Sequence, residues 1–505
     1  MMARALSLNS DRKKVVIVGG GTAGLVIANN LQNHFDVIVI EKSDYVKYPI
    51  RYRVPLLIGI LFRKKGLKYL SKRSQVSDDG RHIPWFESNV LGGASVINGC
   101  VHMFGSKLRW SYITKKFNIE YDELIKSYEN IFSLKTRKKN KINLSLAYQS
   151  TIDNEFIRTL NFLGIPKSDT NYSDKEGCGE IYNTVGLFFR TSVMSLIKKF
   201  GFKCHTSEHV KRLIFNDYNV VGVETNRRKI KSDYVILSGG VVGTCDLLLR
   251  EKSRHKNNNN FIFNNLSFGE NIQDHTNLRV NVSANKSIGS LNEISDSFFQ
   301  KLALISKHYI GVSTVMKGTG ATSAVHLDLD RDGEIDTRIQ VVQFSETGRH
   351  GSDGEFFSNH NPGFSLSITA INPKSKGSIK IDGESNSINP KFLSDKGDVE
   401  LLKLALEFCI KLLKSKPLSE HVLDIENEYD ILTNPERYIR DNVFSSHHLI
   451  GGTHDAINSN FELKSVEGVY VCDASIFDTY TASNIHSSVV LMADIFSKKF
   501  INHNI

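Results

Sequence analysis

The sequence predicts a mixed α/β protein, and three observations carry that prediction. A β-branched run at 15–18 leads directly into a glycine-rich turn and a helical pattern, which is the order of a strand–turn–helix unit. Between about 202 and 238, short alternating runs separated by turn residues predict strands. From about 280 to 440, further alternating runs and one long amphipathic pattern predict a second unit of sheet and helix.

The composition is that of an ordinary globular chain. Its 505 residues are 40% hydrophobic and 23% charged, which is enough for a large core and two structural domains. The net charge is +10, but Lys and Arg are spread along the chain with Asp and Glu among them. We therefore expect a generally basic surface and no nucleic-acid partner, while an anionic substrate stays open.

The six cysteines are widely spaced and form no CxxC pair, which argues against a metal site and a dithiol redox pair. Reduced, buried thiols predict a cytoplasmic protein. Residues 1–14 lack an apolar core of signal-peptide length, and no apolar run reaches bilayer-spanning length. The longest run, 54–62, lies between basic residues. We interpret it as a lid or core segment, with peripheral membrane contact across 51–65 as the alternative.

The N-terminal unit has the spacing of a dinucleotide-binding motif. Gly19 permits a tight turn, Gly21 permits close approach of a pyrophosphate, and Gly24 lets the helix pack on the strand. The helix N-terminus would hold the pyrophosphate, and Glu41, which ends a second strand at 37–40, can accept ribose hydroxyls. The unit alone does not distinguish FAD from NAD as the bound dinucleotide. Its predicted cofactor-binding residues are Gly19, Gly21, Thr22, Ala23, Gly24 and Glu41.

The remaining elements follow from hydrophobic periodicity. Residues 42–90 show few clear elements, and the asparagine-rich stretch at 251–265 is expected to be a surface loop. Helices are expected at 25–31, 121–132, 154–163, 399–414 and 487–500. Strands are expected at 209–215, 220–225, 234–238, 338–344, 364–371 and 377–381.

Further segments follow the dinucleotide unit in an order that is more specific than any one of them. The run LGGASVING at 91–99 is similar to a GGSSxxNG loop, and VILSGG occupies 235–240. GENIQDH at 269–275 matches GxNLQDH, PKSKG at 373–377 matches PKSRG, and GVYVCDAS occupies 468–475. With only one GxGxxG and no redox cysteine pair, the chain resembles the glucose–methanol–choline (GMC) oxidoreductase family over nearly its whole length.

This resemblance implies an FAD-dependent, choline dehydrogenase-like oxidoreductase that oxidises an alcohol (CH–OH) donor. It implies an α/β (α+β overall) fold: an FAD/NAD(P)-binding Rossmann-like domain in β-β-α layers, and a substrate domain of antiparallel sheet plus helices. We predict the FAD-binding domain at 11–280 together with 440–505, and the substrate domain at 281–439, with the stretch near 140–180 open to assignment to the substrate domain. A flavin-retaining lyase and a non-catalytic FAD-binding protein are the alternatives. The substrate, the electron acceptor and the oligomeric state stay open.

Flavin contacts follow from the same resemblance. Gly92 and Gly93 allow the backbone to approach the flavin, and the serine and asparagine of this loop can hydrogen-bond the diphosphate and the isoalloxazine edge. Asp473 ends a strand, where its carboxylate can hold ribityl hydroxyls. A covalent link between His102 and FAD is an alternative, because some relatives bind FAD through a histidine of this loop. The implied contacts are Gly92, Gly93, Ser95, Asn98, Gly99, Val210, Asp473, Ala474 and Asn484.

The C-terminal histidines are the expected catalytic groups. The run HHLIGGT at 447–453 resembles the family's H-x-x-G-T segment with one extra glycine, and His486 lies 13 residues past Asp473, where the family places its second active-site His or Asn. A neutral imidazole with a pKa near 6.5 suits removal of the hydroxyl proton while a hydride moves to flavin N5. We predict His448 as the base and His486 as its partner, with His447 as the rival base.

Overall fold

The computed structural model describes most of the chain. Two segments discussed above lie mainly outside the described residues. They are the apolar segment with its basic flanks, at residues 58–69, and the asparagine-rich loop, at residues 256–262. Membrane contact at 51–65 therefore stays a prediction. Within the described part of the chain, no helix has the length and apolar character that crossing a bilayer requires. The described residues are 12–47, 50–57, 70–76, 80–135, 137–255, 263, 265–296, 298–347, 357–358 and 361–505.

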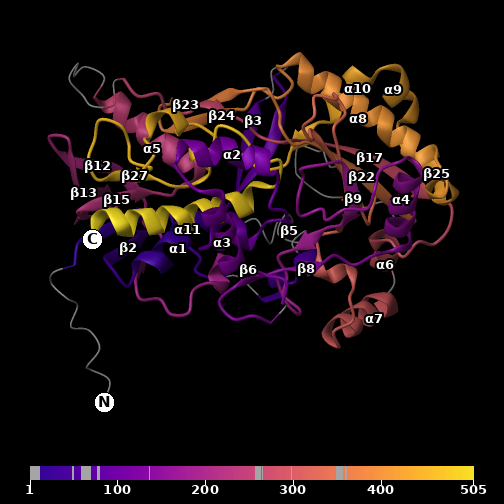
Figure 1. The fold of residues 1–505 in the computed structure, drawn as a ribbon, viewed down its shortest axis with the longest axis horizontal. Coiled ribbons are helices and arrows are strands. Elements are labelled where there is room, and N and C mark those ends of the chain that lie inside the picture. Colours follow the sequence, from indigo (N-terminus) through magenta and orange to yellow (C-terminus); the bar gives the residue numbers. More distant parts are fainter. Residues whose placement is uncertain are drawn as a thin grey trace.

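Five parallel strands form the sheet of the first half, in the order β11-β2-β1-β15-β27 (Figure 1). The central strand β1 is apolar and buried, as a parallel strand covered on both faces should be. The edge strand β27, which pairs with β15, comes from near the C-terminus, so the sheet is completed by segments from opposite ends of the chain. The strands are β1 (Lys14–Val18), β2 (Asp36–Ile40), β11 (Lys203–His205), β15 (Tyr234–Leu237) and β27 (Val469–Val471).

Two further layers enclose this sheet. Helices α1 (Thr22–Leu31) and α11 (Ile485–Asn504) pack on each other and against it. The antiparallel strands β12 (Val210–Asn216), β13 (Asn219–Thr225) and β14 (Lys229–Lys231) form a small sheet that meets β15 through β13. This is the β-β-α layering expected from the sequence.

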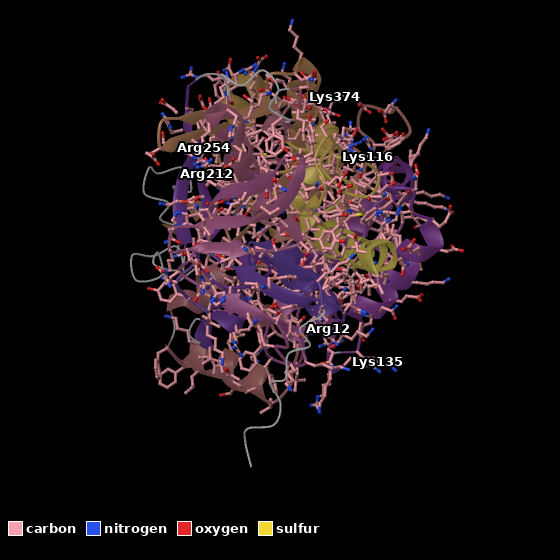
Figure 2. The ribbon with its side chains drawn as sticks, turned by 90° about the vertical axis from the view of Figure 1, so that its left-hand side faces the viewer. Arg12, Lys116, Lys135, Arg212, Arg254 and Lys374 are labelled. Carbon is pink, nitrogen blue, oxygen red and sulfur yellow. The ribbon has the colours of Figure 1, made fainter. Side chains whose placement is uncertain are left out.

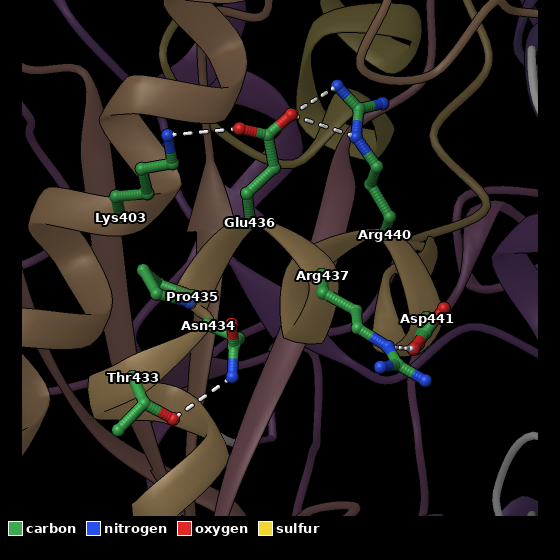
Figure 3. Close-up of a pocket in the computed structure, with 8 residues that line it drawn as sticks. All are labelled: Lys403, Thr433, Asn434, Pro435, Glu436, Arg437, Arg440 and Asp441. Atoms are coloured by element: carbon green, nitrogen blue, oxygen red, sulfur yellow. Dashed lines mark hydrogen bonds and ion pairs between the residues drawn. The ribbon is translucent and has the colours of Figure 1, made fainter.

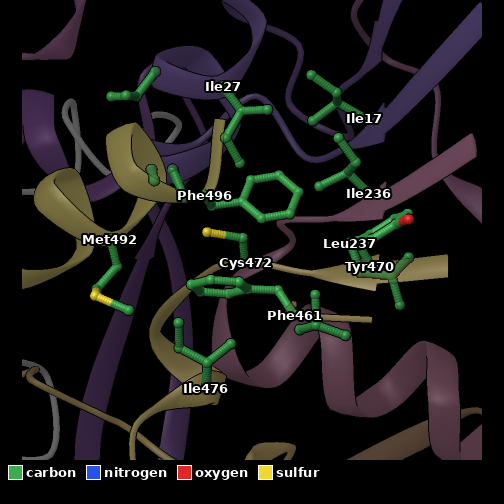
Figure 4. Close-up of a cluster of buried hydrophobic side chains, with 14 of the residues drawn as sticks. Ile17, Ile27, Ile236, Leu237, Phe461, Tyr470, Cys472, Ile476, Met492 and Phe496 are labelled. Atoms are coloured by element: carbon green, nitrogen blue, oxygen red, sulfur yellow. The ribbon is translucent and has the colours of Figure 1, made fainter. Parts of the chain in front are cut away.

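The core of this half lies where α11 meets the sheet. In Figure 4, Phe461 and Phe496 lie on either side of Cys472, with Ile17 and Ile236 of the sheet beside them. The two phenylalanine ring centroids are 5.3 Å apart. Each such buried side chain contributes about 1.5–3 kcal/mol, so α11 is held by packing rather than by helix propensity.

The second half is built on a seven-stranded antiparallel sheet, in the order β25-β17-β22-β19-β18-β9, with β26 paired to β17. Its strands were expected around 338–344 and 364–371, and both are present. The strands are β9 (Gly177–Glu180), β17 (Thr276–Ala284), β18 (Ala321–Leu327), β19 (Thr337–Val342), β22 (Gly363–Ala370), β25 (Val422–Ile425) and β26 (Phe444–Ser445).

The two faces of this sheet differ in chemistry. Ile339 and Val341 of β19 belong to the hydrophobic core that the sheet shares with α4 (Thr151–Phe162) and α8 (Lys396–Lys414). The alternate residues Arg338 and Gln340 lie on the other face, yet they are 2% and 6% exposed. A polar sheet face is therefore buried, and it is the face on which the candidate site is built.

A third sheet corrects one expectation. Residues 42–90 were expected to hold few elements, but strands β3 and β4 form a hairpin there that joins β24 of the β16-β23-β24-β3-β4 sheet. Pro84 in β4 weakened the strand pattern, and an edge strand tolerates it. The strands are β3 (Leu70–Val76), β4 (His82–Ser88), β16 (Glu270–Ile272), β23 (Gly377–Asp382) and β24 (Ser385–Asn389).

The domain boundaries stay a prediction, although two hydrophobic cores exist. Ile152 and Phe156, from the stretch near 140–180, belong to the second core, as does Leu278 of β17. The other helices are α2 (Lys107–Lys116), α3 (Tyr121–Ile131), α5 (Gly240–Arg254), α6 (Leu291–Asp296), α7 (Phe298–Tyr309), α9 (Glu428–Thr433) and α10 (Pro435–Asn442). The other strands are β5 (Val101–His102), β6 (Phe132–Ser133), β7 (Ile142–Asn143), β8 (Ser145–Leu146), β10 (Tyr182–Asn183), β20 (Glu346–Thr347) and β21 (Phe357–Ser358).

Basic side chains are distributed over the surface. They extend from the top to the bottom of the face in Figure 2, so the net charge does not gather in one place on that face. The absence of a nucleic-acid partner stays a prediction. All six cysteines are free thiols, and the cytoplasmic location expected from them also stays a prediction. The labelled basic residues in Figure 2 are Arg12, Lys116, Lys135, Arg212, Arg254 and Lys374.

Candidate active site

The glycine-rich loop between β1 and α1 leaves room for a ligand at one position. Gly19 lies at φ +106°, and a Cβ there would come within 2.4 Å of the Ser238 carbonyl oxygen. A Cβ on Gly24 would come within 2.0 Å of the Gly19 oxygen. At Gly21 the closest such atom would be 4.0 Å away, so this glycine faces open space beside Thr22, where α1 begins. The spacing therefore fits a pyrophosphate at Gly21 and the helix N-terminus.

Glu41 is held beside this loop at the end of β2. Its carboxylate accepts the backbone N–H of Gly20 at 2.6 Å and that of Ser43 at 2.7 Å. These two bonds orient a buried carboxylate, and each oxygen keeps lone-pair capacity for a further donor. The geometry fits the ribose contact expected from the sequence.

The second glycine-rich loop packs directly on the first. The Gly92 N–H donates to the Gly20 carbonyl at 2.8 Å, and a Cβ on Gly93 would come within 2.8 Å of the Gly21 Cα. Both glycines lie at positive φ, so a side chain at either position would be strained. The Ser95 hydroxyl donates to the Gly92 carbonyl at 2.7 Å and closes the turn.

The other expected cofactor contacts surround these loops. The Asn98 side-chain oxygen accepts the Cys100 N–H at 3.1 Å and an Arg190 N–H at 3.3 Å. The Gly99 carbonyl accepts a threonine hydroxyl at 2.8 Å. Val210, the expected adenine contact, begins β12. Arg190 was not anticipated from the sequence, because one arginine in a loop carries no spacing signal.

Asp473 is already engaged by its own turn. Its carboxylate accepts the Gly240 N–H at 2.9 Å, the Thr244 hydroxyl at 2.6 Å and the Ser475 N–H at 2.8 Å. Burial raises the pKa of this carboxyl. These bonds fix the turn after β27, which contains Asp473 and Ala474, against the start of α5. The expected ribityl contact stays a prediction.

His448 is held by the GENIQDH segment. Its backbone N–H donates to the Asp274 carboxylate at 2.8 Å, and its carbonyl accepts the Tyr480 hydroxyl at 2.9 Å. Its ring Nδ1 lies 3.0 Å from Nδ1 of His275, whose ring stacks on Tyr480 at 3.7 Å between centroids. The neighbouring His447 has an exposed side chain and lies at φ +61°. The contacts with Asp274, Tyr480 and His275 thereby orient His448.

The hydrogen bonds of His275 determine which nitrogen of His448 is free. Nε2 of His275 lies 3.0 Å from the Ile371 carbonyl, which can only accept, so this nitrogen carries hydrogen. Burial lowers the pKa of His275 to about 3, so the ring is neutral and its Nδ1 is an acceptor. Nδ1 of His448 must then donate. That leaves Nε2 of His448 with a lone pair, and no described residue hydrogen-bonds it.

Burial also lowers the pKa of His448 well below 6.5, with further lowering by His275, Arg338 and His447. His486, in the first turn of α11, has different neighbours. Burial lowers its pKa to about 4 with a contribution from Arg190, and no described residue forms a hydrogen bond with its buried Nε2. The contacts do not join the two expected catalytic histidines, so their partnership stays a prediction.

His102 lies with His486 rather than with His448. It is buried, its Nε2 is 3.0 Å from the Tyr128 hydroxyl, and its Nδ1 has no hydrogen-bond partner among the residues that the structure describes. Burial lowers its pKa to about 3, with a smaller contribution from His486. Its neutral ring keeps one nitrogen free, and the covalent link to FAD stays an open alternative.

Asn484 and Arg338 connect α11 to the polar face of the large sheet. Asn484 is the N-cap residue of α11, and its side-chain oxygen accepts an N–H of Arg338 at 2.8 Å. Its amide N–H donates to the Val101 carbonyl at 3.3 Å. Asn484 was expected from the sequence, whereas Arg338 was not. Arg338 pairs in register with Thr369 of β22, two residues before the Ile371 carbonyl that His275 contacts, which places it beside the His448 site.

Two other features lie apart from these residues. A depression of about 630 Å³ borders α8 and α10, but its charges pair with one another: Glu436 with Lys403 and Arg440, and Arg437 with Asp441 (Figure 3). The carboxylates of an acidic loop come within 4.8 Å of one another, but they mainly accept backbone N–H groups of that loop, and we assign it no ligand. Its members are Asp328, Asp330 and Asp332.

Comparisons with known proteins relate the chain to one family. Two family models, both described as GMC oxidoreductase, match residues 13–277 and 373–493. A glucose dehydrogenase [FAD, quinone] of Drosophila pseudoobscura pseudoobscura is 22% identical, over 95% of this chain and 85% of that protein. An oxygen-dependent choline dehydrogenase of Photobacterium profundum is 23% identical, over 95% of this chain and 91% of that protein.

The solved structures agree with the fold. The crystal structure of pyridoxine 4-oxidase from Mesorbium loti superposes with a TM-score of 0.81 at 19% identity, over 98% of this chain and 100% of that one. Together with the family models, this confirms the mixed α/β fold class and the FAD cofactor expected from the sequence. The chain belongs to the GMC oxidoreductase family of FAD-dependent enzymes.

Proposed function

We propose that this protein oxidises an alcohol carbon, with FAD as the electron acceptor and His448 as the base. One observation carries the proposal: the hydrogen-bonded series Ile371–His275–His448 leaves Nε2 of His448 as an unpaired acceptor. Relatives named glucose dehydrogenase and choline dehydrogenase support a CH–OH donor.

The cofactor-binding residues are the two packed glycine loops and the carboxylate beside them. Gly21 and the N-terminus of α1 would hold the pyrophosphate, and Glu41 would hold the adenosine ribose. The Gly92–Gly93 backbone would border the flavin. When bound, the flavin supplies the two-electron acceptor for the hydride that leaves the alcohol carbon.

His448 takes the hydroxyl proton at Nε2. Because its pKa lies well below 6.5, the ring is neutral and ready to accept across the physiological range. The hydrogen on its Nδ1 is shared with His275, so the free lone pair keeps one direction. A positioned base of this kind accelerates proton transfer by roughly 10²- to 10⁴-fold. His486 as its partner is part of the proposal and is supported by sequence position alone.

Anaerobic mixing of the purified yellow protein with a panel of alcohols tests the proposal. We expect at least one alcohol to bleach the bound flavin. His448→Ala should keep FAD and slow bleaching by roughly 10²-fold or more. His447→Asn is the matched control, because it changes the adjacent exposed ring at a positive φ that Asn tolerates, and it should bleach normally.

Three outcomes would contradict the proposal. Bleaching of His448→Ala at the original rate would remove His448 as the base. Cleavage of a substrate without bleaching would favour the lyase alternative. Retention of FAD with no reaction of any tested compound would favour the non-catalytic alternative.

A further inference from the structure

Arg338 is a buried cation that no carboxylate neutralises. Its side chain donates to the Asn484 oxygen at 2.8 Å and contacts the Met103 sulfur at 3.0 Å, while its Nε is buried without a partner. Burial lowers its pKa to about 10, so the guanidinium stays charged at neutral pH. An isolated buried charge is costly and normally has a counter-ion. None of the described residues of this protein supplies one.

A second arginine on the same sheet shows the ordinary solution. Arg279 of β17 is ion-paired with the buried carboxylate of Glu346. The carboxylate beside His448, that of Asp274, is engaged with the His448 N–H and the Ser445 hydroxyl. Arg338 therefore differs from its neighbours in having no negative partner.

The groups around Arg338 are neutral and under-bonded. The strand register places His326 of β18 and Thr369 of β22 directly opposite Arg338, on the same face of the sheet. Both ring nitrogens of His326 are buried without partners, and so is the amide nitrogen of Gln340. Burial, with a contribution from Arg338, lowers the pKa of His326 to about 3. One N–H of the neutral His326 ring and the amide N–H groups of Gln340 are therefore donors that suit a ligand with oxygen acceptors.

The cation also lies beside the His275–His448 pair, because Arg338 pairs in register with Thr369 of β22, two residues before the Ile371 carbonyl that His275 contacts. Its charge helps to lower the pKa of both His448 and His275. Asn484 links it to the Val101 carbonyl, two residues from Met103. A ligand that neutralised Arg338 would therefore lie within the site where His448 presents its free nitrogen.

We propose that Arg338 binds a carboxylate of the substrate, so that the substrates of this enzyme are hydroxy acids or hydroxymethyl carboxylates. A planar carboxylate matches the forked guanidinium, and one cation matches one negative charge. The same charge disfavours a quaternary ammonium alcohol such as choline, because like charges repel strongly at a buried site. The identity of the oxidised group rests on the proposed function, whereas the carboxylate site does not.

Carboxylate binding can be tested without turnover. The oxidised, FAD-loaded protein is titrated with formate, acetate and benzoate, and with the neutral isosteres formamide, acetamide and benzamide, while the flavin absorbance spectrum is followed. We expect at least one carboxylate to bind saturably and its amide to bind much more weakly. Arg338→Met should weaken carboxylate binding about 10- to 100-fold, as loss of a hydrogen-bonded charge partner does. Arg158→Met, an exposed arginine of α4, is the matched control and should change nothing.

Turnover separates substrate recognition from a general effect on the reaction. The ratio of kcat/KM for glycolate to that for glycolamide, and for 4-hydroxymethylbenzoate to that for its amide, should favour the acid in the wild type and collapse in Arg338→Met. If Arg338→Met slows acid and amide equally, the guanidinium acts on the alcohol oxygen and the proposal fails. Preference for 2-hydroxyethyl phosphate over both acids would also overturn it.

The outcomes distinguish this inference from the proposed function. Arg338-dependent carboxylate binding without flavin reduction by any alcohol would retain the site and remove the oxidase or dehydrogenase activity. Flavin reduction by alcohols without carboxylate binding would retain the proposed activity and remove the carboxylate site. If Arg338→Met fails to fold, Arg338→Lys tests the inference instead. Lysine keeps the positive charge but lacks the forked guanidinium, so carboxylate binding should weaken while amide binding stays unchanged. Equal effects on both would sink the inference.

Discussion

Nδ1 of His448 and Nδ1 of His275 lie 3.0 Å apart, and one hydrogen serves both. Because the Ile371 carbonyl accepts the hydrogen on Nε2 of His275, the shared hydrogen is carried by Nδ1 of His448. A backbone carbonyl thereby sets the tautomer of the candidate base through an intervening imidazole. This arrangement makes His275 a positioning residue, and four expectations follow from it and from the surrounding site.

Replacing His275 should slow flavin reduction without changing FAD binding. His275→Ala removes the acceptor for the His448 Nδ1 hydrogen, so part of the population will carry hydrogen on Nε2 instead. We expect the reduction rate at saturating alcohol to fall roughly 10- to 10²-fold, at or below the lower end of general-base contributions. Stopped-flow spectroscopy under anaerobic conditions measures it. A change in alcohol affinity alone would show that His275 does not act through His448.

The reduction rate should be insensitive to pH near neutrality. Because the pKa of His448 is lowered well below 6.5, its neutral form dominates above that value and protonation removes the base only at more acidic pH. We expect a flat profile from about pH 6.5 to 8 and a decline only below it. An acid limb centred near 6.5 would mean that the base titrates like a solvated imidazole.

A single methyl group should separate cofactor binding from folding. Gly21→Ala places its Cβ in open space, so the chain should fold but lose FAD, because the methyl occupies the expected pyrophosphate position. Gly24→Ala meets backbone oxygen at 2.0 Å and should fail to fold. Gly243→Ala in α5 meets nothing and should keep both the fold and the colour. Circular dichroism and the flavin spectrum report the outcomes, and a yellow Gly21→Ala protein would place the cofactor elsewhere.

The fold should lose stability as pH falls below 6.5. Several histidines have folded-state pKa values lowered by burial, so the unfolded chain binds protons that the native state does not. Stability is complete above the unfolded pKa and declines toward the folded values, by at most about 1.4 kcal/mol per pH unit for each histidine. Asp153 and Asp473, whose pKa values are raised, oppose this decline. These histidines include His102, His275, His326, His448 and His486.

Urea unfolding at a series of pH values between 7.5 and 5 would measure this slope. His326→Gln should make it shallower, by up to about 1.4 kcal/mol per pH unit, because one titrating group is removed. An unchanged slope in that variant would show that His326 is protonated as easily in the folded state as in the unfolded chain.

The dinucleotide unit was predictable because its signals are local. The β-branched run, the glycine spacing and the acid at the end of β2 all lie within one strand–helix–strand unit, and the structure places β1, α1 and β2 there. The pairing of β3 with β24 depends on distant residues, so residues 42–90 gave a weak pattern.

Arg338 could not have been recognised from its strand. Alternation of Arg338 and Gln340 with Ile339 and Val341 is the pattern of a sheet with one solvated face. Other parts of the fold cover that face, so Arg338 is a buried cation and not a solvated side chain. The local pattern holds no information about that covering.

Sequence spacing was similarly insufficient for the second catalytic group. The distance from Asp473 places both Asn484 and His486 at the start of α11, but Asn484 is the extended N-cap and His486 lies in the first turn, so their side chains leave the chain in different directions. Asn484 faces Arg338, whereas His486 faces His102 and Arg190. Which of them meets the substrate depends on helix rotation, which packing decides.

The contact between α1 and α11 has a consequence for biosynthesis. Ribosomes add roughly 5–20 residues per second, so α1 waits on the order of tens of seconds for the helix that covers it. During that interval the apolar side chains of α1 that α11 will cover lack that partner and are open to aggregation or to a holding chaperone. We therefore expect the coenzyme to enter only after translation has finished, and stalled nascent chains lacking α11 to stay colourless in excess FAD.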